Sequence, residues 1–358
     1  MASKAVAEKW LAEMANLPTA SGREDAVQDW VRAWAGRRPD LKITTDTGGN
    51  LLVTIRGRRR RDPVLAVAHM DHPGFVVTEV TAAGARFEFR GGVLPQYFVD
   101  VRVDFVTGPA KGGRLVEYDP IDKTGLIALT GPRPSPGDVA RWSFGRRRAR
   151  KGYLAAPACD DLAGCAAALA ALDRARKRAD LIHFGVLLTR AEEMGFVGAI
   201  HAATTGSIPQ NARLLSVETS RASADAPLGE GPVIRVGDAS SVFDAELTNR
   251  ITTAVRESGL THQRKLMSGG SCEATAFGAY GLRAAGLCLP LGNYHNMGNL
   301  DLVEEGSGAA VPMLEEVALD DFHGLVDLLL VAAEAVDRDW GLRERLDRVY
   351  AEGRRVLG

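Results

Sequence analysis

The stretch Val64-Leu-Ala-Val-Ala-His-Met-Asp71 decides the fold that we expect for this chain. Its run of apolar residues predicts a strand that is buried on both faces, as in the parallel sheets of α/β proteins. The run ends at a histidine. In open α/β sheets, ligands bind beyond the carboxyl ends of the strands. We therefore expect an α/β fold with a functional site at this edge of the sheet.

Three further apolar runs lead into side chains that can bind metal ions. Residues 181–188 precede Glu193, residues 213–217 precede Glu218, and residues 284–291 precede His295. Asp160 instead opens a predicted helix. Two imidazoles and three carboxylates arriving at one sheet edge can hold a pair of divalent cations. The predicted metal ligands are His69, Asp160, Glu193, Glu218 and His295.

Each of these residues also has an ordinary structural explanation when it is taken alone. A single histidine is often a hydrogen-bonded core or loop residue, Glu218 could lie on the surface, and Asp160 could cap the helix that follows it. Glu192-Glu193 could form an exposed acidic turn, but the apolar strand before the pair argues against this. The metal site is favoured because all five side chains follow the same pattern.

Two neighbours of these residues are predicted to be catalytic, namely Asp71 and Glu192. Asp71 stands two residues after His69, so its carboxylate could reach the second ring nitrogen and fix the tautomer. Glu192 stands beside Glu193 and could act as a general base. If both glutamates extend the strand, their side chains point to opposite sides, one toward the ions and one toward water and substrate.

The composition bounds the class of protein. The chain has 358 residues, of which 46% are hydrophobic and 25% charged, with a net charge of -1, so nothing predicts a nucleic-acid partner. No apolar run reaches the ~18 residues of a membrane span. Four cysteines without CxxC spacing suit a reducing compartment, and we expect a cytoplasmic protein. The sequence contains no G-x-S-x-G, Walker, H-E-x-x-H or Rossmann motif.

The pattern changes along the chain and predicts an insertion. Residues 99–105 alternate apolar and charged side chains, and residues 85–145 show no helical period. We expect a mixed sheet flanked by helices in a catalytic domain of residues 1–73 and 153–340. A small β-barrel-like domain is inserted at 74–152, and 341–358 form a helical tail. The half-exposed strand at 99–105 would need a covering partner, which predicts a homo-oligomer.

At this point the sequence resembles the tetrahedral aminopeptidases, dinuclear zinc or cobalt exopeptidases that include the glutamyl aminopeptidases. The matching segments are Ala68-His-Met-Asp71 with Gly74-Phe-Val76, Asp160-Asp161, Glu192-Glu-Met-Gly-Phe-Val-Gly-Ala199, Leu228-Gly-Glu-Gly-Pro232 and Tyr294-His295. An insert between His69 and Asp160 is typical of this group. The chain departs from the family pattern at Leu162, where the family has Arg, at Glu218, where it has Asp, and in a longer loop after His295.

The resemblance implies an activity and a ligand scheme. It implies two divalent metal ions per chain, bridged by Asp160 and a water. Zinc is the metal that we expect, with cobalt or manganese as alternatives. His69 and Glu218 would complete one site, and Glu193 and His295 the other. Glu192 would move the proton while an N-terminal residue is removed from a peptide. The resemblance further implies a cis peptide bond between Asp160 and Asp161, and a dodecamer.

Two alternatives stay open from the sequence. One is a deacylase or carboxypeptidase built on the same dinuclear core. The other is a metal-binding homologue without catalytic activity, against which Glu192 argues, because a purely structural metal site needs no base.

Overall fold

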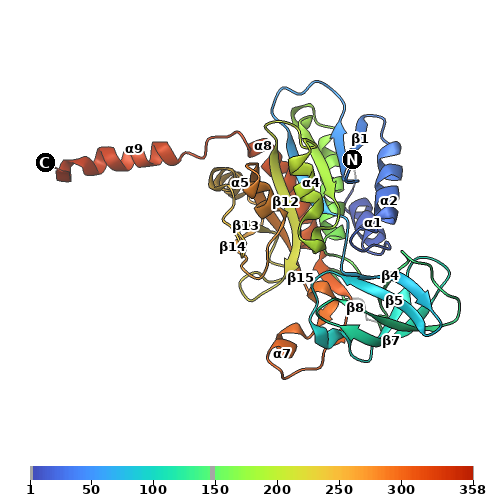
Figure 1. Cartoon of the computed structure of the whole chain (residues 1–358). Helices are drawn as coiled ribbons and strands as arrows, with labels where there is room; N and C mark the ends of the chain where they lie inside the picture. The colour runs from blue at the N-terminus through green and yellow to red at the C-terminus, as the bar shows by residue number, and fades with distance from the viewer. Residues whose placement is uncertain (1–2, 146–149, 358) are drawn as a thin grey trace.

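The computed structural model describes residues 3–145 and 150–357. It combines an α/β/α sandwich with a closed antiparallel barrel below it and a helix that projects to one side (Figure 1). The predicted fold class, a mixed sheet flanked by helices with a small inserted β domain, is confirmed.

The main sheet has eight strands, and its centre is parallel. In spatial order the strands are β1 (Leu41–Thr45), β2 (Leu51–Ile55), β11 (Phe184–Thr189), β3 (Val64–His69), β12 (Arg213–Arg221), β15 (Arg283–Leu291), β13 (Val233–Gly237) and β14 (Gln263–Leu266). Strands β11, β3, β12 and β15 run parallel to one another, so their carboxyl ends meet at one edge.

Helices cover both faces of this sheet, which explains the unbroken apolar runs. The described helices, of which α7 and α9 lie away from the sheet, are α1 (Lys4–Met14), α2 (Asp25–Gly36), α3 (Leu162–Ala175), α4 (Val197–Thr204), α5 (Ala245–Ser258), α6 (Glu273–Ala279), α7 (Leu300–Glu304), α8 (Leu319–Ala335) and α9 (Leu342–Gly353) (Figure 1). Ala66 and Ala68 of β3 pack into the core formed with α1, α3 and α8. Leu65 and Val67 face the opposite core, under α4 and α6.

The inserted domain is a closed barrel around an aromatic core. Its strands, in spatial order, are β4 (Gly74–Thr81), β5 (Gly84–Arg90), β8 (Thr124–Thr130), β7 (Gly112–Asp119), β6 (Arg102–Phe105) and β9 (Val139–Trp142). Phe75 packs edge-on against Phe89 and Trp142 inside it. The expectation of an uncovered strand at 99–105 is wrong, because β6 starts at Arg102 and pairs on both sides, with β7 and β9.

Smaller elements complete the chain. They are the strand pairs β10 (Tyr153–Ala156) with β18 (Glu315–Ala318) and β16 (Met297–Gly298) with β17 (Val311–Pro312), and the 3-10 turns η1 (Pro95–Phe98), η2 (Ala179–Leu181), η3 (Glu192–Met194), η4 (Tyr294–Asn296) and η5 (Arg354–Leu357). Among the residues described, no helix is long and apolar enough to cross a bilayer.

Candidate metal centre

The predicted ligands meet at the carboxyl edge of the parallel strands. His69 is the last residue of β3 and is in register with Thr189, the last residue of β11. Glu218 lies on the neighbouring strand β12. The structure therefore brings together segments that are far apart in the sequence, because parallel strands share one carboxyl edge.

Asp160 lies between the two histidines. Its Oδ1 is 3.3 Å from Nε2 of His69, and its Oδ2 is 3.3 Å from Nε2 of His295. On one side, His69 Nε2 is 3.6 Å from Oε1 of Glu218. On the other, His295 Nε2 is 3.0 Å from Oε1 of Glu193. All five side chains thus converge, with Asp160 in the middle.

These spacings suit metal ligands. Two ligand atoms that are each about 2.1 Å from a tetrahedral ion lie roughly 3.4 Å apart. The buried atoms Nε2 of His69, Oδ1 of Asp160 and Oε2 of Glu218 have no hydrogen-bond partner among the described residues. Buried polar atoms are rarely left in this state, and a cation would satisfy all three. The donor set of imidazole and carboxylate therefore fits divalent ions.

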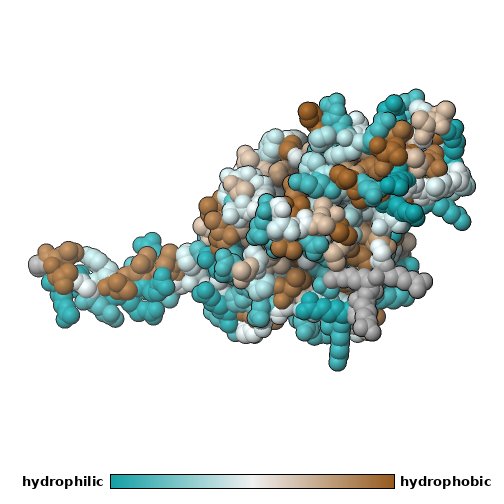
Figure 2. Space-filling view, turned by 90° about the horizontal axis from the view of Figure 1, so that it is seen from below, coloured by the Kyte–Doolittle hydropathy of each residue, from teal (hydrophilic) through white to brown (hydrophobic). Residues whose placement is uncertain are grey.

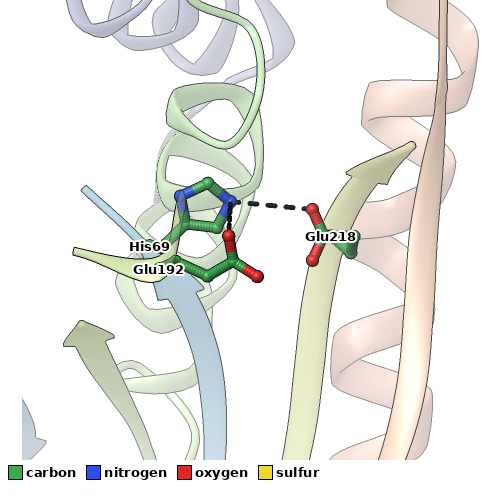
Figure 3. Close-up of side chains that lie close together, drawn as sticks. All are labelled: His69, Glu192 and Glu218. Atoms are coloured by element: carbon green, nitrogen blue, oxygen red, sulfur yellow. Dashed lines mark ion pairs between the residues drawn. The ribbon is translucent and has the colours of Figure 1, made fainter. Parts of the chain in front are cut away.

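Glu192 lies beside this set at a longer distance. Its Oε2 is 4.0 Å from Nε2 of His69, with Glu218 facing both from β12 (Figure 3). Atoms of His69, Glu192 and Glu218 fall within 4.8 Å of one another, as do atoms of His69, Asp160 and Glu193. The 4.0 Å separation is long for two ligands of one tetrahedral ion and leaves room for Glu192 to act on a water.

Several carboxylates are buried close together at this centre, and this shifts their pKa values. Burial raises the pKa of Glu218 to about 7, and the charge of Asp160 adds to this rise. Burial also raises the pKa of Glu192 well above its usual range, and Glu218 and Glu193 contribute. Burial opposes ionisation of Asp160 too, but the two imidazoles beside it hold its pKa well below the ordinary value. A cation would offset the same negative charge.

Asp71 lies next to the second ring nitrogen of His69. Nδ1 of His69 lies 3.1 Å from the backbone carbonyl oxygen of Asp71, and 3.4 Å from its carboxylate. The carboxylate accepts hydrogen bonds from the hydroxyl of Ser21 and from the backbone N–H groups of Glu192 and Glu193. Asp71 therefore faces Nδ1 of His69 with both its main-chain carbonyl and its carboxylate, and the carboxylate also holds the glutamate pair.

The expectation that Glu192 and Glu193 extend a strand is wrong. Strand β11 ends at Thr189, Ala191 adopts a left-handed conformation (φ 50°), and the glutamates lie in the 3-10 turn η3. The turn forms because Asp71 accepts two consecutive N–H groups there. The turn still separates the two carboxylates, one toward His69 and the other toward His295.

The peptide bond between Asp160 and Asp161 is cis, as the resemblance implies. The carboxylate of Asp161 accepts a hydrogen bond from the hydroxyl of Thr219 at 2.6 Å and makes no capping bond to α3. The carboxylate of Asp160 faces the two histidines, so the alternative that Asp160 only caps α3 is not what the structure has.

Sequence reasoning missed Glu315, which holds two of the ligand segments. Glu315 is fully buried at the start of β18. Its carboxylate accepts the backbone N–H groups of Cys159, Asp160 and His295 at 2.7, 3.0 and 2.8 Å. Burial raises the pKa of this carboxyl to about 7. Glu315 opens β18 and does not follow a strand, so no strand-end signal marked it in the sequence.

His72 and Glu24 also support the site. His72 lies 2.6 Å, through Nδ1, from the carbonyl oxygen of Asp160. Buried Glu24 accepts the N–H of Ala191 and pairs with Arg190, so it fixes the turn before Glu192. The hydroxyl of nearby Ser21 donates to the carboxylate of Asp71.

A cavity of about 660 Å³ opens beside the centre. Glu218 and Tyr294 line its inner end, and Arg235 and Lys265 give it positive charge. Leu300, the first residue of α7 in the segment after His295, belongs to its wall. Cavities of this size hold small ligands or parts of larger ones.

Part of the chain matches a known peptidase family. Residues 134–305 match the model of the M42 glutamyl aminopeptidase family, a segment that contains Asp160, Glu192, Glu193, Glu218 and His295. The chain is similar to the M42 glutamyl aminopeptidases. The resemblance expected from the sequence is thereby confirmed.

M42-type peptidases and their relatives match well beyond this segment. A putative aminopeptidase of Acetivibrio thermocellus is 23% identical over 77% of this chain and 88% of its own length. A TET aminopeptidase from a marine sediment archaeon of the Thaumarchaeota superposes with a TM-score of 0.76, at 18% identity, over 93% of this chain and 98% of its own. The TET1 peptidase of Pyrococcus horikoshii has a TM-score of 0.71 and 22% identity, over 91% and 99%. The M42 match supports a metal-dependent aminopeptidase and does not favour a deacylase or carboxypeptidase.

Proposed function

We propose that this chain is a dinuclear metal-dependent aminopeptidase that removes N-terminal residues from peptides. The observation that carries the proposal is the position of Asp160, whose two carboxylate oxygens each lie 3.3 Å from a different histidine. One carboxylate shared by two imidazole-containing ligand sets is an arrangement that fits a pair of ions.

His69 and Glu218 would hold one ion, Glu193 and His295 the other, and Asp160 both. When bound, the two ions would polarise the scissile carbonyl and lower the pKa of a water. Zinc suits the mixture of imidazole and carboxylate ligands, and cobalt or manganese would be accepted by the same donors.

Glu192 would transfer the proton. Its Oε2 would accept the proton of the attacking water and return it to the leaving amine. The N–H bonds to Asp71 fix the turn from which Glu192 projects, so the base is positioned before substrate arrives. Burial of this carboxylate excludes bulk water from the proton path.

We further propose a preference for an acidic first residue. Arg235 lines the cavity next to Glu218, is 2% exposed, and donates through Nη1 to Ser220 at 3.1 Å. Its buried Nε has no partner among the described residues. Arg221, by contrast, is already paired with Glu304. A substrate carboxylate would complete the hydrogen bonding of Arg235.

We also propose self-association and a cytoplasmic location. The TET1 peptidase of Pyrococcus horikoshii can assemble into a tetrahedron or an octahedral shell, and this chain would form a comparable homo-oligomer such as a dodecamer. Light scattering at monomer mass across all concentrations would remove that proposal. The four cysteines are free and buried, which agrees with a reducing compartment.

The test of the activity combines metal analysis with a substrate panel. Purified chain loaded with zinc, cobalt or manganese would be assayed on glutamyl, aspartyl, leucyl and lysyl nitroanilides, with N-acetylated amino acids and N-blocked peptides as controls. We expect about two ions per chain and loss of hydrolysis after chelation. Full activity in a metal-free preparation, or faster cleavage of the blocked substrates, would refute the proposal.

A further inference from the structure

The C-terminal helix α9 extends away from the body of the molecule (Figure 1). None of its residues is buried, although it carries Leu346, Val349 and Tyr350, which are 53%, 60% and 62% exposed. Figure 2 shows hydrophobic residues gathered along this arm. A helix with large apolar side chains in water needs a partner surface.

The spacing of its apolar positions indicates what kind of partner fits. Leu342, Leu346 and Val349 follow one another at intervals of four and three residues, and Gly353 continues the spacing four residues later. This spacing is that of a coiled-coil seam, with Tyr350 beside it. Helices that pack onto a globular core carry a wider apolar face. The seam therefore fits another helix of the same kind.

The charges beside the seam fit a second copy of the same helix. In an antiparallel pair, Leu346 would face Val349 of the other copy, and Leu342 would face Gly353. Arg345 of each copy would then lie beside Glu352 of the other, so the symmetric pair would contain two such contacts. A parallel pair would place Arg345 near Tyr350 and offers no such opposite charges. We propose that α9 binds the α9 of a second chain in antiparallel orientation.

A membrane or a polyanion fits this helix less well. Its charged residues alternate in sign, and Arg343 pairs with Asp347 within the helix. A helix that lies on an anionic surface has a wide apolar face and a strongly basic polar face. Two heptads are too short to hold free helical peptides together strongly. We therefore expect α9 to pair with α9 of another chain when the folded domains of the two chains already lie close together.

Site-directed disulfides test the orientation in the full-length protein. Leu346→Cys and Val349→Cys chains would be oxidised separately and as an equal mixture, then separated on a non-reducing gel. The native cysteines are buried, and unmodified chain measures their background. A cross-link that forms mainly in the mixture supports the antiparallel pair. Cross-links within each single preparation would indicate parallel arms, and no cross-link in any sample would indicate unpaired arms. Both results would overturn the proposal.

Charge reversal tests the same pairing without oxidation. Arg345→Glu and Glu352→Arg should each weaken self-association, measured by sedimentation, by roughly 2- to 10-fold, and the double variant should restore it. Arg348→Glu, the same change on the outer face, is the matched control and should have little effect. Equal loss in the control and the seam variants would contradict the proposal. The proposal would also be contradicted if the chain bound phosphatidylserine vesicles through α9 while none of these variants changed self-association.

Discussion

The backbone carbonyl oxygen of Gly92 lies 2.6 Å from Nδ1 of His295. Gly92 follows the barrel strand β5, whereas His295 follows β15 of the main sheet. The inserted barrel therefore accepts the hydrogen bond that orients a predicted metal ligand and leaves Nε2 free to face Asp160. Tyr97 adds a second tie, because its hydroxyl donates to the carbonyl oxygen of Gly298 at 2.6 Å. The barrel is thus part of the candidate centre as well as a candidate assembly module.

The two adjacent glutamates should be separable by mutation. Glu192→Gln removes the proposed base but keeps its shape, so turnover should fall by about two to four orders of magnitude while metal content stays normal. Glu193→Gln removes a carboxylate 3.0 Å from His295, so metal affinity should fall first and excess metal should restore part of the activity. Metal analysis and initial rates would be measured for both. Loss of metal from Glu192→Gln alone would reverse the two assignments.

Glu315→Gln should weaken metal binding without unfolding the chain. The change places an amide N–H₂ group among three backbone N–H donors that now share one carboxylate. We expect metal affinity to fall about 10- to 100-fold, the usual effect of losing a group that orients ligands. Competition with a chelating dye would measure it. Glu316→Gln, on the neighbouring residue near Arg150, is the control, and equal affinities in the two variants would contradict the role of Glu315.

Arg235→Gln should change substrate preference more than overall activity. If Arg235 binds the carboxylate of the first residue, kcat/KM for a glutamyl nitroanilide should fall about 10- to 100-fold, since hydrogen bonds to charged groups contribute about 1.5–3 kcal/mol. The leucyl substrate serves as the internal control and should be affected far less. A parallel loss on both substrates would point to damage at Glu218, beside which Arg235 lies.

Asp173 should make stability depend on pH. Burial opposes its charge, but hydrogen bonds from Arg38 (2.7 Å) and Arg176 (3.0 Å) lower its pKa below the ordinary value. A carboxylate with a lowered folded-state pKa stabilises the fold above its unfolded pKa of about 3.9, and this contribution is lost as the pH falls. Asp173→Asn should therefore cost about 1–3 kcal/mol near pH 7, and the difference should shrink below about pH 4. Urea unfolding of both chains across this range would test it, and a pH-independent difference would rule it out.

The sequence alone determined the α/β core and the residues that gather at its edge. Apolar runs such as 64–68 and 213–217 identify buried strands, because only a strand covered on both faces can be apolar throughout. His69 is the last residue of β3, and Glu218 lies in the second half of β12, which continues beyond the expected end at 217. Both lie toward the carboxyl ends of adjacent parallel strands, so they approach one another. The apolar pattern of the strands, together with the rule that ligands bind at the carboxyl ends of parallel strands, was therefore sufficient to predict where the candidate site lies.

Only the tertiary structure decided how these side chains are held. The turn at Glu192 depends on the carboxylate of Asp71, the ring of His295 depends on the carbonyl oxygen of Gly92, and three main-chain N–H groups depend on Glu315. The closure of the barrel likewise removed the free edge that the alternating pattern at 99–105 predicted. Most of these partners lie between about 50 and 200 residues apart in the sequence, so no local periodicity records them. They follow from how the folded segments pack, because buried polar groups take whichever partners the packing brings within reach.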